Sequence, residues 1–199
     1  MICIKRVIHA ILNGSDQLVG PDGEVLSLQQ RHHLLRRFLS EIVNTLGDKS
    51  LEEVASSCLA MRDKYGLNYV LYGLRKAVIT RMSTNDRELL IQYLCNEVRA
   101  KKNKQDYFLI LGTLEIFLTY TSLEGEATLN EVARSICSIA LTGTEEEFEN
   151  LVACLTSEKE RQALLNAVNE HKKLLPKRQQ TFDILIEKSK EQWALSLTK

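Results

Sequence analysis

Basic side chains that could bind phosphate gather in three groups of this chain of 199 residues. The first group lies on one predicted helix, the second at the end of another, and the third at a helix end and in the loop after it. The groups are Arg31, Arg36 and Arg37; Arg75, Lys76 and Arg81; and Arg99, Lys101, Lys102 and Lys104. Such side chains attract lipid head groups or RNA phosphates, at about 1 kcal/mol each near a charged membrane. They are therefore candidates for membrane or phosphate binding. The alternative is an ordinary solvated face or, for the last two groups, a response to the helix dipole.

Acidic side chains gather later, on the first turn of another predicted helix. They are Glu145, Glu146, Glu147 and Glu149. The formal net charge of the chain is +0, but residues 26–104 hold 14 Lys or Arg against 8 Asp or Glu, residues 121–171 hold 3 against 10, and residues 172–199 hold 7 against 3. Opposite charge in two regions predicts head-to-tail association of copies of the chain, in which the four glutamates meet the basic region of the next copy. The alternative is two separately solvated surfaces that differ in sign.

The chain lacks the common sequence motifs of catalysis, nucleotide binding and metal binding. The chain has no G-x-x-x-x-G-K-[ST], G-x-G-x-x-G or G-x-S-x-G pattern. Its four histidines form no H-E-x-x-H pattern and no His/Cys set with zinc spacing. The glutamate run complements a helix dipole, which makes a metal or acid–base role unnecessary. We therefore predict a protein that is not an enzyme and has no cofactor, no metal and no small-molecule substrate.

Five cysteines are scattered along the chain, at positions 3, 58, 95, 137 and 154. Their odd number and the absence of a C-x-x-C pair argue against a disulfide framework or a zinc ribbon. We interpret them as buried, reduced thiols in a reducing compartment. The chain shows no secretory signal pattern and no apolar run near the ~18–20 residues that span a bilayer. We expect a soluble intracellular protein whose contact with a membrane, if any, is peripheral.

Helices must position these side chains, because only 2 prolines and 9 glycines occur and good helix formers are abundant. Apolar residues at three- and four-residue spacing predict helices over residues 2–12, 27–46, 50–65, 67–82, 106–120, 129–141, 145–156, 158–175 and 181–197. The polar string 83–86 caps a further predicted helix, which reaches about residue 99. Capping boxes, in which a Ser or Thr is followed three residues later by Glu, support four of the helix starts. They are Ser50 with Glu53, Thr128 with Glu131, Thr144 with Glu147, and Ser157 with Glu160.

The segment 106–120 is apolar nearly all round, which is typical of the buried centre of a bundle. We predict that Leu109, Leu111, Leu114 and Phe117 are among the most buried side chains, and a strand is the competing interpretation of its first half. The polar segment 122–127 is the predicted boundary between two helical subdomains, 1–121 and 122–199. The predicted fold is an all-α multi-helix bundle, in which Trp193 packs the last helix down or, in the other interpretation, anchors a partner.

Residues 38–99 contain three segments in a distinctive order. A helix ends in the sequence LSEIVNTLGDKSLEEV, where a polar turn is followed by a helix led by Leu. The apolar segment YGLNYVLYGLRKAVITRM with its internal Gly73 follows, and then STNDRELLIQYLCNEV and the third basic group. In this order and spacing, residues 38–99 resemble the amino-terminal domain of an orthomyxovirus matrix protein of the influenza type. The chain departs from the family pattern in its longer polar loop before residue 27, its lack of an unbroken R-K-L-K-R run and its shorter length. These departures weigh against RNA and nuclear-import roles more than against membrane association.

The resemblance implies a peripheral layer beneath a viral envelope, made of two helical subdomains that polymerise. It implies basic side chains toward anionic lipid and contacts toward the ribonucleoprotein. A structural, self-assembling matrix-type protein is therefore the function that we expect. The alternative is a cytosolic helical adaptor or host-response antagonist that binds partner proteins. A nucleic-acid-binding protein comes third, because a net charge of +0 and modest basic groups are a poor electrostatic footprint for it.

Overall fold

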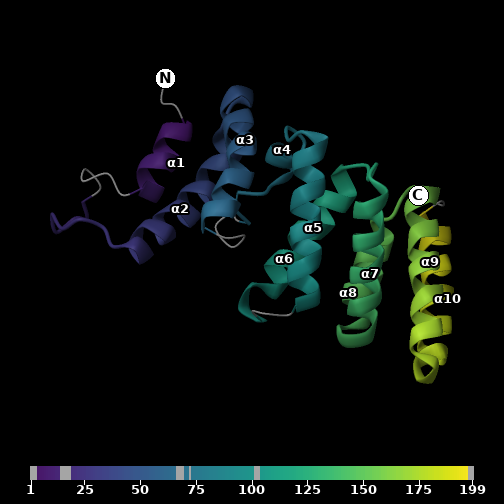
Figure 1. The fold of residues 1–199 in the computed structure, drawn as a ribbon. Coiled ribbons are helices and arrows are strands. Elements are labelled where there is room, and N and C mark those ends of the chain that lie inside the picture. The colour runs from purple at the N-terminus through teal and green to yellow at the C-terminus, as the bar shows by residue number, and fades with distance from the viewer. Residues whose placement is uncertain (1–3, 14–18, 66–69, 72, 101–103, 197–199) are drawn as a thin grey trace. The chain divides into compact units, whose positions relative to one another are not determined.

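The computed structural model of the protein describes residues 4–13, 19–65, 70–71, 73–100 and 104–196. Their regular structure is helical apart from one isolated antiparallel bridge between Val19 and Val25, which confirms the predicted all-α fold (Figure 1). Two compact units make up the chain, unit 1 at residues 1–86 and unit 2 at residues 87–199. The helices are α1 (Ile4–Asn13), α2 (Leu28–Ile42), α3 (Asp48–Tyr65), α4 (Lys76–Ile79), α5 (Thr84–Ala100), α6 (Lys104–Tyr120), α7 (Glu126–Thr142), α8 (Glu145–Ala153), α9 (Glu158–Leu174) and α10 (Gln179–Ser196).

Unit 1 is built on the apolar stripe of α2. Leu35, Leu39 and Val43 recur every four residues and are almost completely buried, as the helical period requires. Helix α1 contacts both α2 and α3, and α3 contacts α4. Helix α2 begins with a capping box in which Ser27 and Gln30 exchange side-chain to backbone hydrogen bonds. The short 3-10 helix η1 (Val43–Thr45) continues α2 and contacts α4.

The helix predicted over residues 67–82 is wrong for the part of it that the structure describes. Val70 and Leu71 lie in a turn, and α helix is restricted to α4. Gly73 packs against α2 so closely that a Cβ atom there would come within 3.3 Å of Leu39 Cδ1. Burying this apolar segment against α2 therefore replaces the continuous helix that local propensity favoured. Residues 66–69 and 72 lie outside the described residues.

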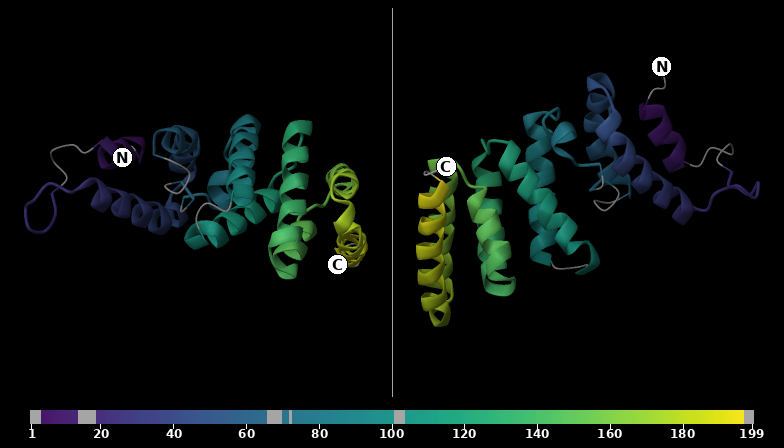
Figure 2. Two further views of the ribbon diagram at one scale, coloured as in Figure 1. Left: turned by 60° about the horizontal axis from the view of Figure 1, so that its bottom comes forward. Right: turned by 180° about the vertical axis from the view of Figure 1, so that it is seen from behind.

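Unit 2 is a stack of three pairs of consecutive helices, α5 with α6, α7 with α8 and α9 with α10, arranged in two layers (Figure 2). Helix α7 packs along α9, α8 packs along α10, and α6 contacts α8. Side chains join α5 to α7, since Gln92 Nε2 donates to Thr128 Oγ1 at 3.0 Å and Ser135 Oγ donates to the Cys95 carbonyl at 3.3 Å. Helices α5, α7 and α9 therefore form one layer and α6, α8 and α10 the other (Figure 2). A helix pair cannot bury its apolar face alone, so each pair depends on its neighbour in the stack.

Two of the four predicted capping boxes are confirmed. Thr144 caps α8 with Glu147, and Ser157 caps α9 with Glu160. The other two predictions are wrong, because α3 begins at Asp48 and α7 at Glu126, which places Ser50 and Thr128 inside their helices. The hydroxyl of Thr128 is completely buried and bonds Gln92 from α5 instead.

The segment predicted to separate two subdomains lies inside unit 2. It does interrupt the helices, since α6 ends at Tyr120 and α7 begins at Glu126. Hydrogen bonds from α5 and α9 hold the segment in place. The Gly125 amide donates to Glu88 Oε1 of α5 at 2.7 Å, and Lys159 Nζ of α9 donates to the Glu124 carbonyl at 3.0 Å. The division between the two compact units follows Asp86. The division into subdomains 1–121 and 122–199 stays a prediction.

Helix α6 is buried on one side. Leu111, Leu114 and Phe117 are at most 4% exposed, as predicted, whereas Leu109 is half-buried and was placed in the core wrongly. Phe108 is 73% exposed. Helix α6 contacts α8 in its own layer. Other helices therefore do not cover all sides of its near-continuous apolar sequence.

The last helix is held against the stack by its apolar stripe and its tryptophan. Phe182 and Leu185 are buried, and Trp193 is 7% exposed. Its Nε1 donates to the Val152 carbonyl at 3.1 Å, and the Arg161 guanidinium lies 5.5 Å from the ring centroid. Packing of the last helix by Trp193 is thus confirmed.

A pair of phenylalanines on α6 tests this burial. Replacing Phe117, which is fully buried, by Ala should lower the free energy of unfolding by about 3–5 kcal/mol through lost transfer energy and the cavity left behind. Phe108→Ala, on the same helix, should change it by less than about 0.5 kcal/mol because its ring is already in solvent. Urea unfolding followed by circular dichroism measures both, and equal losses would contradict the one-sided burial of α6.

Candidate functional site

The first basic group lies on α2, with unequal exposure. Arg37 is exposed and its Nε donates to Glu41 Oε1 at 2.8 Å, in an ion pair whose side chains are 69% and 62% exposed. Arg31 and Arg36 are half-buried. Arg31 precedes Leu35 by one turn, so its aliphatic stem extends the apolar stripe of α2. The group therefore combines one well-exposed guanidinium with two whose stems contribute to packing.

The second basic group surrounds α4 in the same unit. Arg75 is the half-buried residue before the helix and Lys76 is exposed on its first turn. Arg81 has a structural role, since it donates to the Ala77 carbonyl at 2.8 Å and forms an ion pair with Asp48 at the start of α3. Arg75 and Lys76 lie at the start of α4 and are the other two members of this group.

The third basic group belongs to unit 2. Arg99 forms an ion pair with Glu131 of α7 and bonds Asn96 in its own helix. Lys101 and Lys102 lie outside the described residues, and Lys104 is the first residue of α6. The ten basic residues predicted to bind membrane or phosphate are therefore divided between the two units. Two of them, Arg81 and Arg99, form ion pairs between helices.

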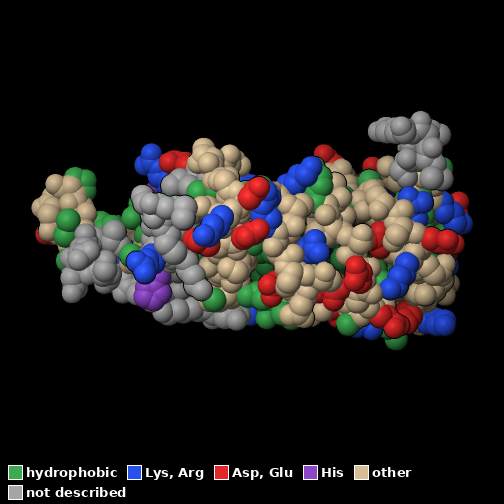
Figure 3. All heavy atoms as spheres, turned by 90° about the horizontal axis from the view of Figure 1, so that it is seen from above, with side chains coloured by type: hydrophobic (Ala, Val, Ile, Leu, Met, Phe, Trp, Pro, Cys, Tyr) green, Lys and Arg blue, Asp and Glu red, His purple; other side chains and the backbone are tan. Residues whose placement is uncertain are grey.

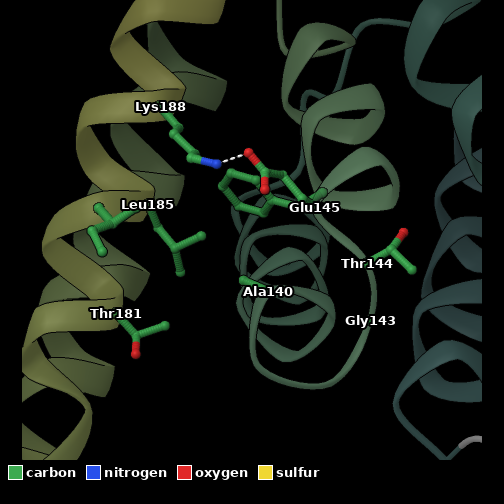
Figure 4. A pocket seen from close by; sticks show the side chains of 9 residues that line it. Ala140, Gly143, Thr144, Glu145, Thr181, Leu185 and Lys188 are labelled. Carbon is green, nitrogen blue, oxygen red and sulfur yellow. Dashed lines mark ion pairs between the residues drawn. The ribbon is translucent and has the colours of Figure 1, made fainter.

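The acidic group is partly neutralised within unit 2. Lys188 of α10 forms ion pairs with Glu145 and, at 4.0 Å, with Glu149, as Figure 4 shows for the first of them. Glu147 accepts the Thr144 amide in the capping box, and Glu146 is exposed. The basic tail of the sequence thus folds back onto the acidic segment, a contact that linear counting did not reveal.

Counting by structural unit gives a weaker charge separation than counting by sequence segment. Unit 1 holds 11 Lys or Arg against 9 Asp or Glu, and unit 2 holds 15 against 17. On the face of the molecule in Figure 3, basic and acidic side chains are interspersed over unit 2. Any self-association through charge must therefore involve local groups and not whole units.

A small cleft lies beside the same ion pair, between the α7–α8 turn and α10 (Figure 4). Its volume is about 210 Å³, and its residues are Ala140, Gly143, Thr144, Glu145, Phe148, Thr181, Ile184, Leu185 and Lys188. Phe148 and Leu185 are buried, whereas Ile184 is 51% exposed. Ligand pockets are commonly about 300–1,000 Å³, so the cleft has room for one side chain of a partner and not for a whole cofactor. The sequence analysis gave no signal for it.

The described cysteines are free thiols. Cys58, Cys95 and Cys137 are buried, as the sequence interpretation predicted, and Cys154 is half-buried. Burial raises the pKa of Cys58 and Cys137 to about 12 and that of Cys95 to about 11. Cys3 lies outside the described residues.

Neither a metal site nor a membrane span is present in the part of the chain that the structure describes. No three His, Cys, Asp or Glu side chains there are close enough together to hold an ion. No helix there is both long and apolar enough to cross a bilayer. Comparisons of the chain with protein-family models, curated proteins and solved structures find no match.

Thiol labelling tests the buried state of the cysteines. At pH 8 a thiol with a pKa of about 12 is ionised in about one molecule in ten thousand, so Cys58 and Cys137 should react with a disulfide reagent only after unfolding. The same shift should weaken the fold at high pH, because the unfolded thiol ionises near 9 while the folded one does not, so stability falls as pH rises from about 9 toward 12. Rapid labelling of either residue in the native protein, located by mass spectrometry, would contradict the burial.

Proposed function

We propose that the protein is a non-catalytic structural protein of the viral matrix type. It assembles with copies of itself on the inner face of an anionic membrane and links that membrane to a ribonucleoprotein. Its place would then be the cytoplasmic face of the membrane and, in a virion, the interior beneath the envelope. The ribonucleoprotein contact comes from the resemblance of residues 38–99, and the membrane contact is supported by unit 1.

The observation that carries the membrane proposal is the contact between Gly73 and Leu39 in unit 1, at 3.3 Å for a Cβ built on Gly73. Arg36 and Arg37 precede Leu39 by less than one helical turn, and Arg75 and Lys76 lie two and three residues after Gly73. Two basic segments that are distant in the sequence are therefore brought to the same part of one unit.

The ion pair in this region leaves Arg37 able to bind phosphate. Both Arg37 and Glu41 are more than half exposed, and exposed pairs contribute about 0–1 kcal/mol. A lipid phosphate can therefore replace the carboxylate at little cost. Arg81 and Arg99 differ from Arg37, because their own side chains are only 29% and 28% exposed and each pairs with a carboxylate of another helix. The membrane-binding residues are thus expected to be Arg36, Arg37, Arg75 and Lys76, with Arg31 beside them.

Co-sedimentation with liposomes tests the membrane role. Replacing Arg36, Arg37, Arg75 and Lys76 together by Gln keeps most of each stem and removes four charges. Binding to vesicles that contain phosphatidylserine should fall at least about a hundredfold, since each charge contributes about 1 kcal/mol. Wild-type binding should also weaken with salt, because the Debye length falls from about 10 Å at 0.1 M to about 3 Å at 1 M.

A matched control removes four exposed charges from unit 2, by Gln at Arg134, Lys173, Lys177 and Lys190. It should bind as the wild type does. The membrane role fails if the control loses as much binding as the unit 1 variant, or if the wild type ignores anionic vesicles at low salt.

Self-association between the basic region of one copy and the acidic start of α8 in the next is the second part of the proposal. Because Lys188 pairs with Glu145 and Glu149, reversing the glutamates alone would also repel α10. Glu145→Lys, Glu146→Lys and Glu149→Lys are therefore combined with Lys188→Glu, and Glu147 is kept because it caps α8.

This variant should lose assembly on vesicles while its thermal unfolding by circular dichroism stays close to that of the wild type. Mixing it with a second variant, in which Arg36, Arg37, Arg75 and Lys76 are changed to Glu, should partly restore assembly through the reversed pairs. Cross-linking on vesicles measures both, and unchanged assembly of the first variant would rule out the contact.

A second candidate function is binding of partner proteins as a helical adaptor, which the cleft beside Ile184 favours. The cleft has the exposed side chain of Ile184 beside buried Phe148 and Leu185, so it could receive one anchoring residue of a partner. Two results together would favour the adaptor. The wild type would not bind anionic vesicles, and it would bind a partner protein whose binding is lost in the variant Ile184→Asp.

A further inference from the structure

Helix α6 has one face that the described part of unit 2 leaves largely uncovered from residue 108 to residue 115. Phe108 is 73% exposed, and Gly112 and Glu115 are half-buried. Their spacing of four and three residues places them on one side of the helix. Leu114 and Phe117 are completely buried on the other side. The uncovered face ends before Thr119, whose hydroxyl lies 3.4 Å from Cys154 Sγ at the end of α8.

Gly112 has no function within the chain that would explain a glycine. It lies inside a helix, where glycine is less stable than alanine by about 0.5–1 kcal/mol. A Cβ atom built on Gly112 would meet nothing within 4 Å, so the fold itself does not need its absence. Positive φ, which would favour glycine, is recorded among the described glycines at Gly23 and not at Gly112. A missing side chain on an open helix face allows another chain to approach the backbone closely.

Phe108 supplies the complementary shape, one turn away on the same face. Its ring is held edge-on by Tyr107, with the centroids 5.8 Å apart and the planes at 69°. A large exposed side chain and a gap therefore lie four residues apart. When two such helices pair antiparallel about a twofold axis, residue i of one contacts residue j of the other and the reverse. With the axis at residue 110, each Phe108 ring lies over the partner's Gly112.

We propose that α6 is a dimerisation face, on which it pairs antiparallel with the α6 of a second copy so that each Phe108 covers the opposite Gly112. The charges of the helix suit this arrangement. Helix α6 contains Lys104 near its start and Glu115 near its end, with Asp106 as its other charge. In the antiparallel register position 104 faces position 116, so the first turn of one helix, whose sequence contains Lys104, lies opposite the turn of the other that contains Glu115.

The surroundings of Glu115 agree with a partner from outside. Burial alone raises the pKa of its carboxyl. A lysine from a second copy would stabilise the ionised form of this half-buried group. Tyr120, which is 43% exposed at the end of the helix, adds apolar area to the same region.

The other large apolar side chains that the described residues expose do not complement the gap at Gly112. Among the described residues, the large apolar side chains that unit 1 exposes are Val19 and Val25, at the isolated bridge and not on a helix. The large apolar side chains exposed near the end of the chain are Leu174 on α9, Leu175 between α9 and α10, and Ile184 on α10. The aromatic side chain that complements the gap at Gly112 is thus found on α6 itself.

This contact deepens the self-association part of the proposed function, on which it rests. Exposed ion pairs are individually too weak to hold copies together, so an assembly also needs apolar area, and α6 provides it. A twofold contact on α6 and a separate head-to-tail contact can coexist, because they use different surfaces. Together they would extend a dimer into an array.

Exchange of the two complementary residues tests the proposal in solution, without membrane. Sedimentation velocity of the full chain over a range of concentrations should show a monomer–dimer equilibrium. Phe108→Gly and Gly112→Phe should each raise the dissociation constant at least about tenfold, the first by removing the ring and the second by filling the gap. The double variant Phe108→Gly/Gly112→Phe should return to within about threefold of the wild type, because a ring again faces a gap.

Circular dichroism checks that each variant is folded, which is expected because the ring is exposed and the space at Gly112 is open. Ile184→Ser removes another exposed apolar side chain, on α10, and should leave the dimer intact. A wild-type monomer at all concentrations, a double variant no better than the singles, or equal loss in Ile184→Ser would overturn the proposal.

Liposome binding separates the α6 dimer from the proposed membrane role. If the wild type dimerises as described but ignores anionic vesicles, the α6 contact stands and the membrane role fails.

Discussion

Docking of α10 on α8 is the contact on which the surface of unit 2 depends. Trp193 and Phe182 bury its apolar stripe, and the Trp193 indole satisfies a backbone carbonyl of α8. Only with α10 in this position does Lys188 reach Glu145 and Glu149. The electrostatic character of the acidic group is therefore a consequence of apolar packing one helix away. Both the cleft beside Ile184 and any charge-driven assembly begin from this docked state.

The helices of this protein could be predicted from its sequence because their cause is local. Apolar residues at helical spacing define nearly every element, and the caps at Thr144 and Ser157 mark two starts correctly. The failures have non-local causes. Gly73 is drawn against Leu39 from another helix, and the hydroxyl of Thr128 bonds Gln92 instead of capping its own helix. A residue pattern within one segment contains no information about either neighbour.

The candidate site was predicted less well, because charge counts along a sequence ignore pairing in space. Arg81 with Asp48 and Arg99 with Glu131 are ion pairs between residues more than thirty positions apart. Each removes one basic side chain from the set available to a ligand. The cleft gave no sequence signal, since its residues come from three helices and the turn between two of them. What remained predictable was the position of Arg36, Arg37, Arg75 and Lys76 on or beside helices of one unit.

The chain contains a single tryptophan, and it lies in the contact between α8 and α10. The indole is almost completely buried, bonds the Val152 carbonyl and lies beside the Arg161 cation, so its emission depends on that contact remaining closed. Intrinsic fluorescence of the protein is therefore a local signal from one end of the helix stack. A shift of the emission maximum to longer wavelength would report release of the last helix, while events confined to residues 1–86 would leave the spectrum unchanged.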